Sequence, residues 1–320
     1  MKSIKQDSNN PNLFNIEPED VWEKVSKAEG DGPPSSDEWI RVLNSSYANY
    51  NSHLGLVCRS KEGTLNIGAG LYICEYDSNN HKFFLRKISV VPETYINLDN
   101  FDEELKNDIN IFLASKELHK DLGIPYRRGA LLHGSPGTGK TSFIKQQIAA
   151  FSDQAFIVFF SEFPGTTQIE ALCRVPLPKI FIFEEVTQIL RDGEDSKFLN
   201  LLDGVEALDS TYVIATTNYP EDLPGNIVDR PSRFELLIEF NELNAKQAAT
   251  LAEGFLKRPL TKKEAELMDG FSSAYIKEIC LYSLSRSIVV IDAVKRYSER
   301  KKVVKNKFAK PKTRIGFVNE

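Results

Sequence analysis

The sequence predicts an α/β fold in which a parallel sheet is flanked by helices, with a β-rich part before it and a small α-helical part after it. Three observations predict this fold. An apolar run at residues 130–132 leads into a glycine-rich loop and then into a segment that can open a helix. Two more apolar runs, at 155–160 and 179–183, are continuous, as buried parallel strands are. Residues from 243 to about 300 read as mostly helical.

The glycine-rich stretch at 134–141 reads G-S-P-G-T-G-K-T. Its strand–loop–helix context is what a phosphate-binding P-loop requires. Glycines let backbone N–H groups turn toward phosphate oxygens, and the following helix directs its positive end at them. Lys140 can reach the β and γ phosphates, and the Thr141 hydroxyl can bind magnesium. A chance match is disfavoured because every fixed position is filled. The residues expected to bind nucleotide here are Ser135, Pro136, Gly137, Thr138, Gly139, Lys140, Thr141 and Ser142.

Composition sets the class of protein. The 320 residues are 41% hydrophobic and 27% charged, as in a soluble globular protein, and the formal net charge of −5 gives no global nucleic-acid signature. The four cysteines are widely separated without a C-x-x-C pair, so we expect reduced thiols. No apolar run could span a bilayer, and the N-terminus has no apolar signal region. We therefore expect a cytoplasmic protein without a membrane partner.

The N-terminal third divides into two parts. Residues 1–36 are polar and end in G-D-G-P-P-S-S at 30–36, which predicts a flexible leader that ends in a linker, with one short helix around 21–22. Residues 37–98 hold short β-prone runs at 54–58, 65–67, 70–76 and 82–91, separated by turn signals, which predicts a small β-rich domain built of hairpins. This domain shows no catalytic constellation. It could contact a substrate or partner, and a purely structural role is the alternative.

A resemblance becomes specific at residues 123–143, which read G-I-P-Y-R-R-G-A-L-L-H-G-S-P-G-T-G-K-T-S-F. This run resembles the AAA family of ATPases, and is most similar to the branch of mitochondrial chaperones that translocate the Rieske iron–sulfur protein. The resemblance covers about residues 101–300, within which the sequence also predicts helices at 101–118 and 196–205. It implies an AAA+ P-loop core at 99–241, a helical lid at 242–300, and ATP with magnesium as cofactors. It also implies that the backbone near Gly123 and Ile124 lies against adenine. The Rieske translocases have a membrane span and a mitochondrial address that this chain does not show.

Two acids, Glu184 and Glu185, follow the apolar run 179–183. The carboxyl end of a buried strand is where open α/β sheets bind ligands, so one acid would hold magnesium and the other would polarise the attacking water. The alternative is a pair of exposed acids that ends a strand. AAA proteins usually carry Asp then Glu here, and the Rieske branch carries Glu then Asp. Glu185 keeps the catalytic identity, whereas the longer Glu184 can shift the magnesium geometry. Slow hydrolysis would be compatible with this departure, and loss of both roles is not expected.

Three more site residues follow from the resemblance. Asn218, after a strand-like run at 211–217, matches the sensor that positions water near the γ-phosphate, although Asn is also a common turn residue. Arg230 and Arg233 match two arginines that face the nucleotide of the neighbouring subunit, where a guanidinium stabilises transition-state charge. Local salt bridges are the alternative. Arginine fingers, which act on the nucleotide of a neighbouring subunit, require an oligomer. A head-to-tail contact that closes on itself gives a homo-oligomeric ring, here expected to be a hexamer or heptamer.

The end of the chain holds two further patterns. Residues 270–276 read G-F-S-S-A-Y-I and resemble the lid signature G-F-S-G-A-D-[IL], from which Ser273 and Tyr275 depart. The tail at 301–320 is basic, and it is either a solvated helix end or a contact for nucleic acid or an acidic partner.

AAA proteins that thread peptides carry a loop with an aromatic–apolar–glycine sequence. Residues 163–165 imitate it, but the segment that follows is short, so the resemblance does not predict peptide threading.

The sequence as a whole predicts magnesium-dependent ATP hydrolysis by an oligomeric ring. This ring is expected to remodel or move a macromolecular partner, for which a protein is the first choice. Two alternatives remain open at this point. One is a nucleic-acid-linked loader or helicase accessory, which the basic tail would support. The other is a nucleotide-gated scaffold that binds ATP, assembles and barely turns over, which the departure at Glu184 would support.

Overall fold

The computed structural model describes residues 5–7, 10–16, 39–42, 56–59, 65–77, 82–88, 101–160, 162–163, 169, 172–173, 175–190, 198, 202, 210–223, 225–228 and 233–308. The chain divides into two compact units. Unit 1 comprises residues 1–135 and 140–240, and unit 2 comprises residues 136–139 and 241–320. The tip of the glycine-rich loop therefore belongs to the same unit as the C-terminal helices.

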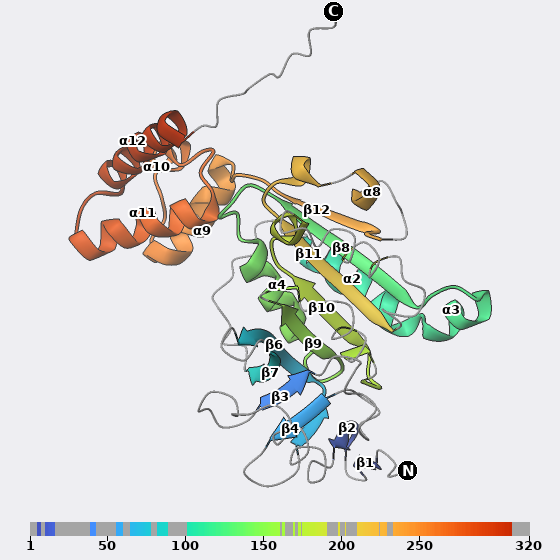
Figure 1. Cartoon of the computed structure of the whole chain (residues 1–320). Coiled ribbons are helices and arrows are strands. Elements are labelled where there is room, and N and C mark those ends of the chain that lie inside the picture. Colours follow the sequence, from blue (N-terminus) through green and yellow to red (C-terminus); the bar gives the residue numbers. More distant parts are fainter. Residues whose placement is uncertain are drawn as a thin grey trace, which may run out of the picture. The chain divides into compact units, whose positions relative to one another are not determined.

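A sheet forms the centre of unit 1, in the strand order β12-β8-β11-β10-β9-β6-β7-β3-β4 (Figure 1). Parallel pairing joins β12 (Leu236–Phe240), β8 (Arg127–Gly134), β11 (Thr211–Thr217), β10 (Lys179–Phe183) and β9 (Phe156–Phe160). Every residue of β9, β10 and β11 is buried, as strands covered on both faces must be. The predicted α/β fold with a parallel sheet is confirmed.

Alternate residues of the strands supply two separate cores, one on each face of the sheet. Phe181 and Phe183 of β10 lie in one core, and Ile180 and Ile182 lie in the other. The second core also contains apolar side chains of α2 (Phe101–Ala114) and α4 (Lys140–Ala149), so these helices cover that face. The remaining helical elements described in unit 1 are short: α3 (Lys116–Leu122), α6 (Val186–Ile189), α8 (Gly225–Val228) and a 3-10 turn at Pro220–Asp222.

A helix predicted for 101–118 is two helices in the structure. Ser115 lies between α2 and α3, and its backbone N–H and its hydroxyl both donate to the carbonyl of Phe112, at 3.0 and 2.9 Å. A serine side chain that bonds to the preceding turn competes with the helix ladder, which explains why α2 ends here.

A polar cluster joins α2 to the sheet. The guanidinium of Arg128 on β8 donates to both carboxylate oxygens of Asp108 at 2.6–2.9 Å, and the Tyr212 hydroxyl on β11 donates to the same carboxylate at 2.6 Å. Burial raises the pKa of Tyr212, and the charge of Asp108 adds to the effect. Because all three groups are paired, the cluster fixes α2 beside the strand that leads into the loop.

The N-terminal strands are β1 (Lys5–Asp7), β2 (Asn10–Ile16), β3 (Trp39–Val42), β4 (Leu56–Arg59), β5 (Leu65–Gly68), β6 (Gly70–Asp77) and β7 (Lys82–Ile88). The strands predicted at 70–76 and 82–91 are confirmed as the antiparallel pair β6–β7. β6 also pairs in parallel with β9, so these strands continue the core sheet.

Two strands lie inside the stretch predicted as a flexible leader. β2 pairs with β1 and with β5 in a second, three-stranded sheet. The local sequence N-P-N-L-F-N-I contains β-prone residues that the polar composition of the whole stretch conceals. The helix predicted around 21–22 and the linker at 30–36 lie outside the described residues. The domain boundaries at 36, 98 and 241 stay predictions.

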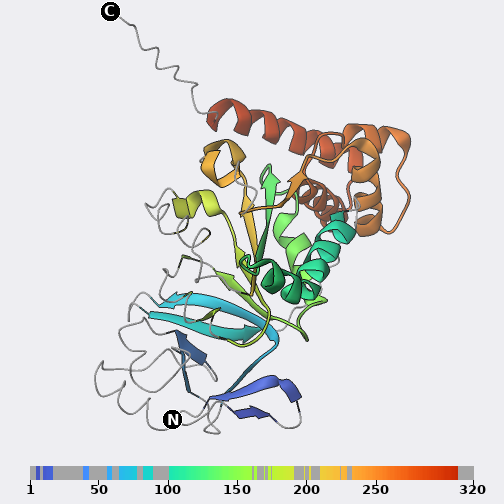
Figure 2. The same cartoon turned by 90° about the vertical axis from the view of Figure 1, so that its right-hand side faces the viewer.

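Unit 2 contains four helices in its described part: α9 (Ala245–Leu256), α10 (Lys262–Leu267), α11 (Ser273–Arg286) and α12 (Val290–Phe308). α11 packs on α9 and α12, and α10 also contacts both of these helices (Figure 2). Capping boxes start α9 at Asn244 and α10 at Thr261, each closed by a side chain three residues later. The helical character predicted for 242–300 is confirmed, and α12 extends into the basic segment.

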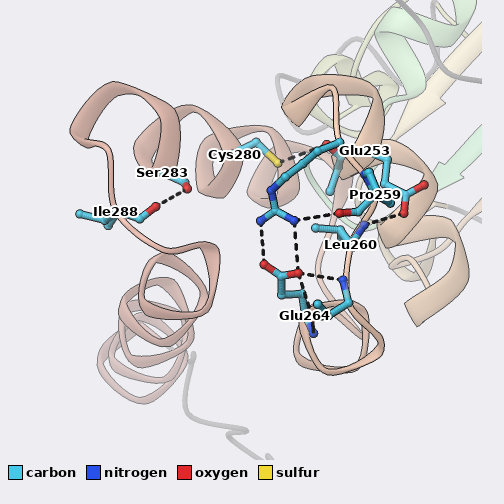
Figure 3. A network of polar contacts seen from close by, with 10 residues as sticks. Glu253, Pro259, Leu260, Glu264, Cys280, Ser283 and Ile288 are labelled. Atoms are coloured by element: carbon cyan, nitrogen blue, oxygen red, sulfur yellow. Dashed lines mark hydrogen bonds and ion pairs between the residues drawn. The ribbon is translucent and has the colours of Figure 1, made fainter.

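Glu264 is the centre of the polar network in unit 2 (Figure 3). Its carboxylate accepts from Arg258 at 2.7 and 3.3 Å, and from the N–H and hydroxyl of Thr261 at 2.8 and 2.9 Å. The hydrogen bonds from Arg258 lower the pKa of Glu264 from 4.5 to about 2. A depressed carboxyl pKa stabilises the folded state fully above the unfolded value, and this contribution is lost as the pH falls toward the folded value.

We expect Glu264→Gln to destabilise unit 2 by about 2 kcal/mol at pH 7, because a charged hub of four hydrogen bonds becomes neutral. The difference from wild type should shrink as the pH falls from 4.5 toward 2. Amide hydrogen exchange of α9 and α10 in the full chain, at pH 7 and pH 3.5, measures both effects. Glu266→Gln on the same helix is the matched control. The side chain of Glu266 is 61% exposed, and its ion pair with Lys262 is long, at 3.8 Å. Equal destabilisation by the two variants would contradict the assignment.

Candidate active site

The glycine-rich loop has the backbone that its sequence predicts. β8 ends at Gly134 and α4 begins at Lys140, and the φ angles of Gly134, Gly137 and Gly139 are 134°, 77° and 104°. Residues with a Cβ rarely adopt these φ angles. A Cβ at Gly134 would lie 2.0 Å from the carbonyl oxygen of Phe240, so the close passage of β12 also requires glycine there. The predicted strand–loop–helix arrangement is confirmed.

Lys140 is buried at the start of α4, with 6% of its surface exposed. Its ammonium donates to the carbonyls of Gly134 and Ser135, at 2.7 and 3.1 Å, and to Oδ1 of Asn218, at 2.6 Å. Burial lowers the pKa of Lys140, and the negative charge of Glu185 opposes that effect. The ammonium is thus held among neutral acceptors at the mouth of the loop, where phosphate oxygens would be stronger acceptors.

The two acids lie where the sequence predicts, immediately after β10. β10 and β11 are parallel neighbours in register, so their carboxyl ends place Asn218 beside the acid pair. The Asn218 amide donates to Oε1 of Glu185 while its own oxygen accepts from Lys140. One residue at the start of α4 and two that follow the ends of β10 and β11 therefore form one hydrogen-bonded chain, Lys140–Asn218–Glu185.

The backbone of Glu185 is held in an unusual conformation. Its φ and ψ are 53° and 52°, which is left-handed for a residue with a side chain. Its N–H donates to the hydroxyl of Thr216 at 3.0 Å. The next threonine, Thr217, contacts the Thr187 hydroxyl at 3.2 Å and accepts from the N–H of Tyr219 at 3.0 Å. Sequence reasoning missed these threonines, although polar residues at the end of an apolar buried strand were the available signal.

Glu184 has an oxygen that fits a cation. Its Oε1 is buried and, within the described part of the chain, has no hydrogen-bond partner. A carboxylate oxygen in that position is costly unless a cation or a water binds it. The half-buried Thr141 follows Lys140 in the first turn of α4. No group of three or more His, Cys, Asp or Glu among the described residues is placed to hold a metal ion. Magnesium typically takes most of its ligands from phosphate and water, so one carboxylate and one hydroxyl suit it.

The residues predicted to contact adenine lie at the end of α3. Gly123 ends this helix with a left-handed φ of 64°, and the N–H of Ile124 donates to the carbonyl of His119 at 3.0 Å. The side chain of Ile124 is 49% exposed, so it presents apolar surface of the kind that a flat aromatic base can cover. The adenine contact itself stays a prediction.

The two predicted arginine fingers differ in what the structure describes. Arg230 lies outside the described residues. Arg233 precedes β12, is only 5% exposed and has an interaction within the chain. A finger that acts on a neighbouring subunit must reach outward, so the burial of Arg233 favours Arg230 for that role. The role of Arg233 in trans stays a prediction.

The segment that imitates a threading loop begins with an aromatic that is packed inward. Phe163 is partly buried, and its ring lies 5.8 Å from that of Phe198 and 6.4 Å from that of Phe183. Residues 164–168 lie outside the described part, as does most of the helix predicted at 196–205. Of that helix, Phe198 and Leu202 are described, and both are helical and buried.

Residues 130–242 match the model of the ATPase family associated with various cellular activities (AAA). This segment is an AAA ATPase domain. Its span includes the loop, both acids, Asn218 and both arginines, so the predicted family resemblance is confirmed.

Relatives of the AAA domain come from several branches. The chain is 34% identical to the "Probable mitochondrial chaperone bcs1" of Schizosaccharomyces pombe over 43% of this chain and 33% of that protein. It is 30% identical to the "Proteasome-activating nucleotidase" of Sulfurisphaera tokodaii, over 55% of this chain and 52% of the relative. It is also 30% identical to the "26S proteasome regulatory subunit 8 homolog B" of Arabidopsis thaliana, over 61% and 54%. The matches thus span about half of these relatives or less. Within the described part of the chain, no helix is both long and apolar enough to cross a membrane.

Proposed function

We propose that this chain hydrolyses ATP with magnesium as a homo-oligomeric ring and uses the energy to remodel or move a protein partner in the cytoplasm. The observation that carries the proposal is the hydrogen-bonded chain Lys140–Asn218–Glu185 at the mouth of the AAA P-loop. It joins a phosphate-binding cation, a polar positioning group and a carboxylate, which are the groups that phosphoryl transfer to water requires.

Each group has a role in this proposal. The loop N–H groups and Lys140 bind the phosphates, and Lys140 exchanges its bonds to backbone carbonyls for stronger bonds to phosphate oxygens. Glu185 polarises the attacking water and accepts its proton, and Asn218 orients both the acid and the water. Thr141 and the unpaired oxygen of Glu184 would hold magnesium, which neutralises charge on the β and γ phosphates when bound.

The names of the relatives support a protein partner. They include mitochondrial chaperones, proteasome-activating nucleotidases and 26S proteasome regulatory subunits. Within the described residues, Phe163, the aromatic of the segment that imitates a threading loop, packs against the core. We therefore propose that the partner is moved or remodelled without threading. The proposed ring rests on the resemblance of Arg230 to an arginine that acts on the nucleotide of a neighbouring subunit.

The test is steady-state ATP hydrolysis measured against protein concentration, with the oligomeric state followed by sedimentation velocity. Specific activity that rises with concentration and reaches a plateau as rings form would support a ring ATPase. Tight ATP binding and assembly with negligible turnover would refute the motor and support the nucleotide-gated scaffold. Activity that is constant down to the concentration of monomers would refute the ring.

One observation favours a second candidate, a nucleic-acid-linked factor. The sequence of α12 contains seven basic and two acidic residues, although the whole chain has a net charge of −5. The guanidinium groups of Arg286 and Arg296 both lie over the ring of Tyr282, at 5.1 Å from its centre. Both arginines are exposed, and guanidinium forks bind phosphate well.

Fluorescence anisotropy with a labelled DNA single strand tests that candidate. Binding that weakens steeply with salt and is lost in the Arg286→Ala/Arg296→Ala double variant would support it. A Lys246→Ala/Lys262→Ala double variant, which removes two exposed lysines elsewhere in unit 2, is the control. No binding at low salt, or equal losses in both double variants, would refute it.

A further inference from the structure

The first turn of α11 binds the tip of the P-loop within unit 2. The carbonyl oxygen of Gly137 accepts two hydrogen bonds from this turn. One comes from the N–H of Ala274 at 2.9 Å, and the other from the hydroxyl of Ser273 at 2.8 Å. The fit is close, because a Cβ on Gly137 would lie 3.0 Å from the Cβ of Ala274. One loop carbonyl thus holds two donors of the helix.

These bonds complete the start of α11. The first N–H groups of a helix have no partner inside it, and a side chain at the N-cap usually accepts from one of them. Ser272 is the N-cap of α11, but its side chain makes no capping hydrogen bond. The Gly137 carbonyl takes that place by accepting from Ala274. The helix therefore depends on the loop for part of its N-terminal capping.

The same bonds fix the loop. Gly137 has a φ of 77°, and a glycine peptide can rotate between orientations at little cost. In a planar trans peptide, the Gly137 carbonyl and the following N–H of Thr138 point in opposite directions. Donors that hold the carbonyl toward α11 therefore direct the Thr138 N–H away from α11. Backbone N–H groups with a fixed direction are what a phosphate-binding loop needs.

We propose that Ser273 is a positioning residue for nucleotide binding, whose hydroxyl holds the Gly137 peptide in the orientation that presents the Thr138 N–H to a bound phosphate. This inference rests on the proposed binding of ATP at the P-loop. The lid signature that this segment resembles carries glycine at the position of Ser273, and a glycine would leave only the backbone donor of the next residue. The serine adds a second donor on one carbonyl, and its Oγ lies 3.3 Å from where a Cβ of Gly139 would be.

The experiment measures the Kd of a fluorescent ADP analogue and the kcat and KM of ATP hydrolysis, in the full chain. We expect Ser273→Ala and Ser273→Gly each to weaken nucleotide binding about fivefold, the equivalent of one hydrogen bond. KM should rise with Kd while kcat changes less than about twofold, because the hydroxyl acts on binding and not on the reacting groups. Ser273→Thr, which restores a hydroxyl, should recover the affinity.

Ser283 provides the matched control. It lies toward the other end of α11, and its hydroxyl donates to the carbonyl of Ile288 at 2.7 Å (Figure 3). Ser283→Ala thus removes a similar bond from the same helix without touching the loop, and we expect unchanged affinity.

Two results would overturn the inference alone. One is an equal Kd of the wild type and of Ser273→Ala for the fluorescent ADP analogue. The other is an equal loss in Ser283→Ala, which would show that general stability of α11 is responsible. A wild-type chain that fails to bind ATP would instead refute the proposed function, and the inference with it.

Discussion

Glu185→Gln should lower the rate of ATP hydrolysis by a factor of ~10²–10⁴, while ATP still binds with nearly wild-type affinity. Glutamine has the shape of glutamate, and its amide oxygen can accept the hydrogen bond that Asn218 now donates to Oε1. The chain Lys140–Asn218–Glu185 would keep its geometry and lose only the basic group. Single-turnover phosphate release measures the rate, and a fluorescent ATP analogue measures the affinity.

Glu162 offers a control for that substitution, because it is an exposed acid after β9, the strand beside β10. Glu162→Gln should hydrolyse ATP as wild type does. The assignment of the catalytic acid is wrong if Glu185→Gln stays active while Glu184→Gln loses activity. That outcome would exchange the roles of the two acids.

Arg230→Ala should lower kcat by ~10³-fold or more, with little change in nucleotide affinity, assembly or melting temperature. The reason is that an arginine supplied by the neighbouring subunit stabilises charge that develops only in the transition state. Arg233→Ala should differ, because Arg233 is buried within its own chain and has an interaction there. We expect this second variant to lower the melting temperature.

Steady-state kinetics, sedimentation velocity and thermal melting distinguish the two arginines. An active Arg230→Ala enzyme beside an inactive Arg233→Ala enzyme of normal stability would reverse the assignment. Loss of assembly in Arg230→Ala would show that the arginine holds the subunits together and would leave its effect on chemistry without support.

Much of the site could be predicted from the sequence because its signals are local. The loop 134–141, its flanking strand and helix, and the acids after 179–183 are contiguous, and each has a physical reason for its residue types. The strands β9, β10 and β11 are recognisable because double burial makes them uniformly apolar. The contact between Asn218 and Glu185 follows once β10 and β11 are known to be neighbours.

Other features depend on pairings that no short stretch reveals. β6 joins β9 across some eighty residues of chain, and the alternation of its side chains does not name that partner. Thr216 holds the Glu185 backbone only because two strand ends meet. The bonds of Ser273 and Ala274 to Gly137 join segments more than a hundred residues apart. The burial of Arg233 likewise depends on how the turn before β12 packs, which its motif does not show.

The most direct test of a ring with shared active sites mixes two inactive variants, Arg230→Ala and Glu185→Gln, under conditions in which subunits exchange. In a mixed ring, an Arg230→Ala subunit keeps its own Glu185 and receives Arg230 from a Glu185→Gln neighbour. Roughly a quarter of the interfaces in a random equimolar mixture would be complete. The account predicts that ATP hydrolysis reappears on mixing, at a corresponding fraction of the wild-type rate. Co-assembly of the two variants, shown by affinity tags, without any recovered hydrolysis would contradict it.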